Sequence, residues 1–261
     1  MKYKRVLPLG DPHAGHRVGL TPPRFQSAIP GEQFHRIQVE LWNYYKNGIE
    51  ELKKEHPIDV LVCNGDAIDG PGTRSGGTEL ITTDPNIQID IAYEALAIAD
   101  AKNYCFTYGT SYHTGQDADH EKVLADRFGG TIKSQLWLDV NGTIFDIRHH
   151  IGNSSIPHGK GTPIAKEWLW NVLWNAEGEQ QPKADVYLRS HVHNHALVGG
   201  VDWIGMTLPA LQGQGSKFGA RRCSQIVHFG FVWFDCYEDG SYRWQRKILV
   251  LESQKQTALK L

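Results

Sequence analysis

The sequence predicts an α/β fold built on mixed sheets, and three observations support this prediction. Short apolar runs alternate with segments of helical periodicity through the first half of the chain, as in strand–helix–strand units. Two patterns typical of hairpins follow in the second half and add antiparallel strands. The 261 residues are 40% hydrophobic and 10% aromatic, which is enough for a substantial core. We therefore expect one domain over residues 1–261.

The first half of the chain alternates predicted strands with predicted helices. Strands are expected in the apolar runs 6–9, 60–62 and 104–108. Apolar residues at helical spacing predict helices over 33–55, 86–102 and 121–128. The segments 14–33 and 70–86 are rich in glycine and proline, so we expect long loops there. Long ordered loops in compact domains usually serve function.

The second half adds two hairpins and one further helix. Asn141-Gly142 is a two-residue turn signal between alternating segments, and Glu238-Asp239-Gly240 marks a second turn. The expected elements, in order, are strands over 135–140 and 143–147, a helix over 163–176, and strands over 186–188, 229–237 and 242–251.

The helix expected over 163–176 carries three tryptophans, Trp168, Trp170 and Trp174. Their helical spacing favours packing in the core. Trp170 cannot share a helix face with both of the others, so the alternative is that one of the three lies at a contact surface.

Composition narrows the class of protein. The formal charge of −2 gives no basic footprint for tight nonspecific nucleic-acid binding, although nucleic acid remains a candidate substrate. The four cysteines form no C-x-x-C pair, which favours reduced core residues. We see no signal peptide and no apolar stretch near the ~18 residues that cross a bilayer. We expect a cytoplasmic protein with no membrane partner.

Aspartate and histidine recur at the points where predicted strands end. These residues are Asp11 and His13, Asp66, His113, His149 and His150, and His191 and His193. In an open α/β sheet the carboxyl ends of the strands meet at one crevice, so we expect these side chains to converge. Carboxylate and imidazole ligands without thiolates suit Mn, Fe, Ni or Zn. Two such ions grip a phosphate and activate water, so the pattern predicts phosphoester hydrolysis.

Each motif also has a simpler structural explanation. Asp11 could cap a turn beside an incidental surface His13. Consecutive side chains of an extended segment point in opposite directions, so only one of His149 and His150 is expected to be a ligand, and we favour His149. For Asp69 we favour a role in orienting a ligand over direct coordination.

The order of the motifs resembles the calcineurin-like metallophosphoesterases. The segments that carry the resemblance are Asp11-Pro12-His13, Gly65-Asp66-Ala67-Ile68-Asp69, Gly109-Thr110-Ser111-Tyr112-His113, His149-His150 and Ser190-His191-Val192-His193. The resemblance implies a four-layer αββα sandwich of two mixed sheets flanked by helices. It also implies two divalent metal ions and hydrolysis by attack of a metal-bound hydroxide.

The resemblance assigns a role to each residue of the cluster. The expected first-metal ligands are Asp11, His13, Asp66 and His193, and the expected second-metal ligands are Asp66, His149 and His191. His113 would protonate the leaving oxygen. Where the family has Gly-Asn-His, this chain is two residues longer and has no asparagine. A hydroxyl of Thr110 or Ser111, or a water, could take the place of the asparagine.

The expected substrate is a phosphate ester, monoester or diester, with nucleotides and nucleic-acid ends as the leading candidates. Lys217, Arg221 and Arg222 lie in a glycine-rich segment over 212–222 that could bind a nucleotide, or could be a solvated basic turn. The alternatives are a DNA exonuclease or endonuclease of the same family and a noncatalytic metal-binding scaffold. The oligomeric state stays open.

Overall fold

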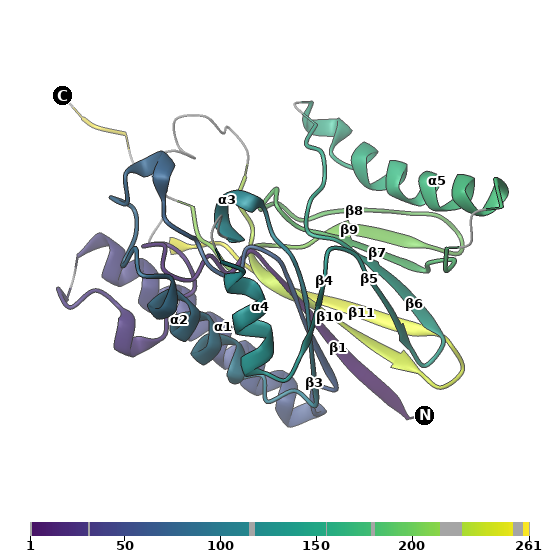
Figure 1. Cartoon of the computed structure of the whole chain (residues 1–261), viewed down its shortest axis with the longest axis horizontal. Coiled ribbons are helices and arrows are strands. Elements are labelled where there is room, and N and C mark those ends of the chain that lie inside the picture. Colours follow the sequence, from purple (N-terminus) through teal and green to yellow (C-terminus); the bar gives the residue numbers. More distant parts are fainter. Residues whose placement is uncertain are drawn as a thin grey trace.

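The computed structural model places two sheets face to face with helices on both outer sides (Figure 1). It describes residues 2–30, 32–114, 118–154, 156–178, 181–214, 226–252 and 258–260. Within these residues the first sheet has six strands, in the order β11-β10-β1-β2-β3-β4, and the second has five, in the order β5-β6-β7-β9-β8. Each sheet contains parallel and antiparallel pairs. The predicted sandwich of two mixed sheets is confirmed.

The first sheet combines parallel strands from the N-terminal half with a C-terminal hairpin. Its strands are β1 (Tyr3–Gly10), β2 (Val60–Asn64), β3 (Asn103–Thr107), β4 (Thr131–Lys133), β10 (Phe229–Tyr237) and β11 (Tyr242–Leu249). The helices of this half are α1 (Gln33–Glu55), α2 (Pro85–Ala97), α3 (Ser111–Thr114) and α4 (His120–Arg127). Helices α1, α2 and α4 cover the outer face of the sheet (Figure 1).

The second sheet carries a single helix on its outer face. Its strands are β5 (Leu136–Val140), β6 (Thr143–Ile147), β7 (Val186–Arg189), β8 (Ala196–Gly199) and β9 (Ile204–Thr207). Helix α5 (Thr162–Ala176) lies over β7, β8 and β9. Short 3-10 turns occupy Pro23–Phe25, Thr73–Ser75 and Pro157–Gly159.

Strand β2 shows how alternation divides the core into two clusters. Leu61 and Cys63 point to the helices of the first sheet, whereas Val60 and Val62 point to the second sheet. Because successive side chains of a strand face opposite sides, a strand buried on both faces is apolar throughout. One apolar layer therefore lies between the sheets and a second lies under α1, α2 and α4.

Three short strands, one helix end and one strand end differ from the prediction. Helix α2 ends at Ala97 instead of residue 102, because the chain turns there and Asp100 adopts a left-handed φ of 48°. Strands β4, β8 and β9 are three or four residues long and were not predicted. Strand β11 ends at Leu249, before residue 251.

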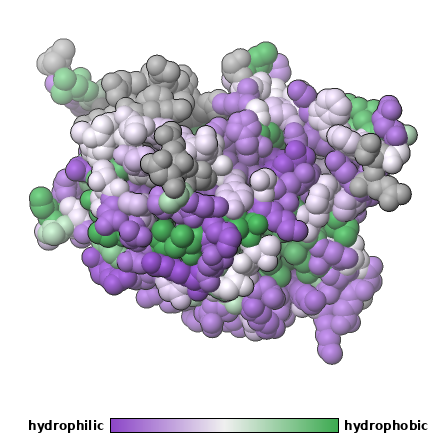
Figure 2. Space-filling model, in the orientation of Figure 1, coloured by the Kyte–Doolittle hydropathy of each residue, from purple (hydrophilic) through white to green (hydrophobic). Residues whose placement is uncertain are grey.

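The prediction of core packing for the tryptophans of α5 is wrong for two of the three. Trp168 stacks on Trp203 with ring centroids 4.9 Å apart. Trp170 and Trp174 are exposed, because α5 has the sheet on one side only. Some hydrophobic surface is visible over α5, at the upper right of Figure 2.

None of the helices in the described part of the chain is both long enough and apolar enough to cross a membrane. Cys63, Cys105 and Cys236 are free thiols, as expected. Cys223 lies outside the described residues.

Candidate metal centre

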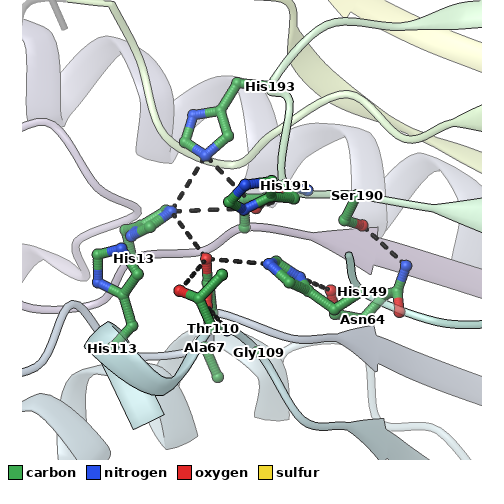
Figure 3. Close-up of polar contacts among 12 residues, drawn as sticks. His13, Asn64, Ala67, Gly109, Thr110, His113, His149, Ser190, His191 and His193 are labelled. Carbon is green, nitrogen blue, oxygen red and sulfur yellow. Dashed lines mark hydrogen bonds and ion pairs between the residues drawn. The ribbon is translucent and has the colours of Figure 1, made fainter. Parts of the chain in front are cut away.

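The aspartates and histidines that follow the strands converge in one cluster (Figure 3). Asp11 and His13 follow β1, Asp66 follows β2, His149 follows β6, and His191 and His193 follow β7. His113 lies on the one-turn helix α3, which follows β3. The cluster draws on both sheets, because β1, β2 and β3 belong to the first and β6 and β7 to the second.

The backbone at these residues is unusual. Seven non-glycine residues in the described part of the chain have a positive φ, and five of them are in the cluster: Asp11, His13, Asp66, His191 and His193. A left-handed φ costs a residue with a Cβ about 1 kcal/mol or more and persists only where surrounding structure enforces it. The sharp turns after β1, β2 and β7 aim these side chains back over the strand ends.

Asp11, His13 and His193 form the first group of possible metal ligands, with ligand atoms all within 4.8 Å of one another. The Nε2 atoms of His13 and His193 lie 3.1 Å apart. His193 Nε2 is 3.4 Å from an Asp11 carboxylate oxygen. Ring nitrogens that face each other at this distance must share a proton or a cation.

Asp66, His149 and His191 form the second group within the same 4.8 Å limit. His149 Nδ1 donates to the backbone oxygen of Asn64 at 2.8 Å, which leaves the Nε2 lone pair as the free ligand atom. That Nε2 is buried and forms an ion pair with Asp66 Oδ2 at 3.0 Å. One carboxylate and two imidazoles whose ligand atoms converge within 4.8 Å form a donor set that fits a divalent cation, which can take the place of the proton between His149 and Asp66.

Asp66 links the two groups. Its Oδ2 lies 3.9 Å from His13 Nε2 of the first group and 3.0 Å from His149 Nε2 of the second. Its Oδ1 accepts a hydrogen bond from the backbone N–H of Thr110 at 2.7 Å and lies 3.1 Å from the Thr110 hydroxyl. The side chain of Ser111 is exposed, so of the two hydroxyls considered for the missing asparagine only that of Thr110 adjoins Asp66.

His113 lies beside the first group and is held by Asp69. His113 Nδ1 donates to the Asp69 backbone oxygen at 2.7 Å, so its Nε2 is the atom left to act on a ligand. The Asp69 carboxylate instead contacts His13 Nδ1 at 2.9 Å, which orients the His13 ring. Asp69, His13 and His113 also meet the 4.8 Å criterion as a third group.

Burial and charge act in opposite directions on the ionisable groups of the cluster. Burial tends to raise the pKa of Asp11 and Asp66, but His193 and His149, respectively, outweigh it and the pKa of each carboxyl is lowered. Burial tends to lower the pKa of His149, but the Asp66 carboxylate raises it to about 10. Without a metal, protons on the imidazoles therefore balance the two buried carboxylates, a balance that bound cations can replace.

Two glycines allow close approach beneath the cluster. A Cβ at Gly65 would lie 2.5 Å from the His149 ring, and a Cβ at Gly109 would lie 2.1 Å from Asp66 Oδ1. Neither distance is possible between real atoms, so both positions exclude any side chain.

Asn64 is a positioning residue that sequence reasoning missed. Its Nδ2 donates to Ser190 Oγ at 2.8 Å and to the Arg148 backbone oxygen at 3.1 Å, and its Oδ1 accepts from Thr107 Oγ1 at 2.6 Å. Asn64 thus connects the ends of strands from both sheets. The available signal was a polar residue at the end of an apolar run, just before Gly65.

Glu121, at the start of α4, was also missed. Its two carboxylate oxygens accept from the backbone N–H groups of Ala67, at 3.0 Å, and Gly109, at 2.7 Å. These residues follow Asp66 and precede Thr110, so one buried side chain holds both loops. Burial and the charge of Asp66 raise the pKa of Glu121 to about 7. No local signal separates Glu121 from the surface residues of a short helix.

Lys217, Arg221 and Arg222 lie outside the described residues. Residues that follow His149 and His150 in the chain line a cavity of about 570 Å³; they include Ile151, His158, Lys166 and Glu167.

Comparisons with known families and curated proteins found nothing: no family model matches the chain, and neither does any curated protein. Among solved structures, an archaeal phosphodiesterase is 11% identical, with 94% of this chain and 99% of that chain covered and a TM-score of 0.46. Zinc-bound Vps29 from Entamoeba histolytica is 13% identical, with 94% and 98% covered and a TM-score of 0.45. A predicted phosphoesterase from Streptococcus pneumoniae is 11% identical, with 95% and 99% covered and a TM-score of 0.37.

With identities this low and TM-scores below 0.5, the likenesses themselves carry no argument. Two mixed sheets flanked by helices, with joined Asp–His groups across the strand ends, resemble the calcineurin-like metallophosphoesterases, in agreement with the order of the sequence motifs.

Proposed function

We propose that the chain is a metal-dependent phosphoesterase. The observation that carries the proposal is the position of Asp66, whose carboxylate adjoins both groups of possible ligands, 3.9 Å from His13 Nε2 and 3.0 Å from the buried Nε2 of His149. Two neighbouring cation sites that share a carboxylate are the arrangement that phosphoester hydrolysis uses.

The proposed ligands follow the two groups. Asp11, His13, Asp66 and His193 would hold one divalent ion. Asp66, His149 and His191 would hold the other, with Thr110 next to them. Oxygen and nitrogen ligands without thiolates favour Mn, Fe, Ni or Zn. When bound, such ions neutralise phosphate charge and make water a stronger nucleophile.

His113 is the proposed proton donor to the leaving oxygen. Its Nδ1 is fixed by the Asp69 backbone oxygen, so its Nε2 is the atom that faces the reaction. A positioned imidazole typically contributes a factor of about 10²–10⁴ to such a step. Asn64 and Glu121 would hold the loops that carry the ligands.

The proposed substrates are phosphate monoesters or diesters in the cytoplasm, with nucleotides and nucleic-acid ends as the leading class. The cavity of about 570 Å³ that residues after His149 and His150 line has room for a substrate larger than inorganic phosphate. Lys217, Arg221 and Arg222 are proposed to contribute further cationic contacts.

The test is hydrolysis of bis-p-nitrophenyl phosphate and p-nitrophenyl phosphate by metal-stripped protein, with Mn, Fe, Ni, Zn or Mg added back. We expect metal-dependent turnover that Asp66→Asn reduces by at least ~10³-fold, because the shared ligand is lost. Asp202→Asn, an exposed aspartate near β9, is the matched control. Turnover that persists in metal-free protein or in Asp66→Asn would refute the proposal. Cleavage of DNA faster than of either ester would favour the nuclease alternative.

One observation favours a second candidate, a noncatalytic metal-binding scaffold. The asparagine of the family motif is absent, and Thr110, a neutral hydroxyl, adjoins Asp66 instead. A scaffold would bind metal, as measured by calorimetry, yet turn over neither ester with any ion.

A further inference from the structure

Helix α5 has an apolar surface on the side that faces away from its own sheet. Its inner side carries the buried residues Ile164 and Asn171. It also carries Trp168, which stacks on Trp203, the residue just before β9. A helix on the surface of a domain normally presents charged residues to water on its opposite side. On α5 that opposite side carries leucine and tryptophan.

The exposed residues follow strict helical spacing. Positions 166, 169, 170, 173, 174 and 177 are the i, i+3, i+4, i+7, i+8 and i+11 positions of one helix face. We call this face the α5 stripe; its members are Lys166, Leu169, Trp170, Leu173, Trp174 and Glu177. The exposed fractions are 46% for Leu169, 56% for Trp170, 39% for Leu173 and 44% for Trp174.

The apolar area of the stripe is large for one helix. At about 250 Å² for each tryptophan, Trp170 and Trp174 together expose on the order of 250 Å², and the exposed parts of Leu169 and Leu173 add to this. The largest apolar patch of a typical monomer is about 300–600 Å² and is often functional. Exposed Val172 lies beside the stripe and adds to this apolar area.

The charges of the stripe complement each other under two-fold symmetry. Lys166 and Glu177, both exposed, stand at the two ends of the apolar stretch, about 16 Å apart along the helix. In an antiparallel pair with its axis between positions 171 and 172, Lys166 meets the partner's Glu177. In the same register Leu169 meets the partner's Trp174, and Trp170 meets the partner's Leu173. Every member of the stripe then has a partner of matching chemistry.

The helix dipole adds an independent argument for this direction. Glu177 stands at the C-terminal end of α5, where the dipole of its own helix disfavours a negative charge. In an antiparallel pair the same carboxylate lies beside the N-terminal half of the neighbouring helix, where a negative charge is favoured. A parallel pair would place like charges together.

We propose that the α5 stripe pairs with the stripe of a second copy of this chain, as an antiparallel and two-fold symmetric helix pair. A symmetric interface of this kind is closed and self-complementary, so association stops at the dimer. The proposal does not depend on the proposed phosphoesterase activity, because no residue of the metal cluster belongs to the stripe.

Sedimentation equilibrium from micromolar to submillimolar concentration tests the proposal. We expect a monomer–dimer equilibrium in the wild type, with a dissociation constant that Leu173→Glu raises on the order of 100-fold. Lys166→Glu, which places two glutamates together, is expected to raise it about 10-fold. The charge swap Lys166→Glu with Glu177→Lys is expected to restore wild-type association. Val123→Glu, at an exposed position of α4, is the matched control and should change nothing.

Circular dichroism of each variant checks that the fold is kept, and acrylamide quenching gives a second readout. Trp170 and Trp174 become shielded in the dimer, so quenching of the wild type should decrease as concentration rises. A wild type that stays monomeric overturns the proposal and leaves the stripe to a different protein. A dimer that tolerates Leu173→Glu, or a charge swap that fails to rescue Lys166→Glu, also overturns it.

Discussion

His113 illustrates how one backbone contact selects the chemistry of a side chain. The Asp69 carbonyl accepts from Nδ1 at 2.7 Å, and a carbonyl cannot donate, so the ring keeps its Nδ1 proton in either charge state. The Nε2 atom alone can exchange a proton with a ligand.

His113→Gln is expected to lower kcat by about 10²–10⁴-fold for an alkyl or phenyl diester. The loss should be much smaller for bis-p-nitrophenyl phosphate, whose leaving oxygen needs little protonation. Metal affinity, measured by calorimetry, should stay at the wild-type value. An equal loss for both esters would contradict a role in protonating the leaving oxygen.

Gly109 tests how tightly the cluster is built. A Cβ there would lie 2.1 Å from Asp66 Oδ1, so Gly109→Ala must displace the shared carboxylate. We expect metal affinity to fall about 10–100-fold, as for loss of other groups that orient ligands. Gly161→Ala is the matched control, because its Cβ would have an ordinary contact of 3.6 Å with Val198. Unchanged calorimetric affinity in Gly109→Ala would show that Asp66 tolerates displacement.

The residues that follow strands were predictable, and those that hold them were not. Asp11, Asp66 and His193 could be foreseen because strand ends converge whatever the details of packing. Glu121 could not, because its burial depends on loops from β2 and β3 that approach it only in the folded chain. Its neighbour Lys122 is exposed, and the local sequence does not distinguish the two.

At the scale of elements, α4 contributes a buried carboxylate that joins two loops. The pKa of Glu121 is raised from 4.5 to about 7, first by burial and then by Asp66. Below pH 4.5 this carboxyl is protonated in both the folded and the unfolded protein. Between pH 4.5 and about 7 it is ionised in the unfolded protein but still protonated in the folded one, so rising pH favours unfolding. Stability of the metal-free protein should therefore fall as pH rises through this window.

Glu121→Gln removes this titration. The unfolding free energy of the variant, relative to the wild type, should improve by about 3 kcal/mol between pH ~4 and ~8. Urea denaturation in the presence of a chelator measures it. Asp126→Asn, at an exposed acid of the same helix, is the control. A difference between Glu121→Gln and wild type that is constant with pH would contradict the raised pKa.

The prediction of elements depended on their length. Helix α1, over Gln33–Glu55, is long and periodic and was predicted in full. Strands β8 and β9 have four residues each. An alternation of apolar and polar residues over so few positions cannot be distinguished from chance. Strand β9 pairs with β7, and β8 pairs with β9. These pairings depend on tertiary structure and cannot be seen in a short stretch of sequence.

At the scale of the whole molecule, the cluster spans the two sheets. Asp11, His13 and Asp66 follow strands of the first sheet, and His149, His191 and His193 follow strands of the second. A bound ion would therefore join the two halves of the sandwich as well as serve chemistry.

Metal should stabilise the fold. At a free Mn concentration 100 times the dissociation constant, we expect about 2.7 kcal/mol of added stability. For a chain of this size this corresponds to a rise in Tm of roughly 5–10 °C. Calorimetry of the wild type and of Asp66→Asn, with and without chelator, measures it. A rise of equal size in Asp66→Asn would place the stabilising ion elsewhere.

The sheet order also sets when the Asp–His cluster can be fully aligned during synthesis. Strand β1, which leads into Asp11, lies between β2 and β10, and β10 starts only at Phe229. A ribosome has therefore released every aspartate and histidine of the cluster before β1 gains its second neighbour. Contacts between such distant segments form late in folding. A nascent chain stalled before β10 would carry all these aspartates and histidines while β1 has β2 as its one neighbour in the sheet, so the support beside Asp11 is complete only after β10 has been made.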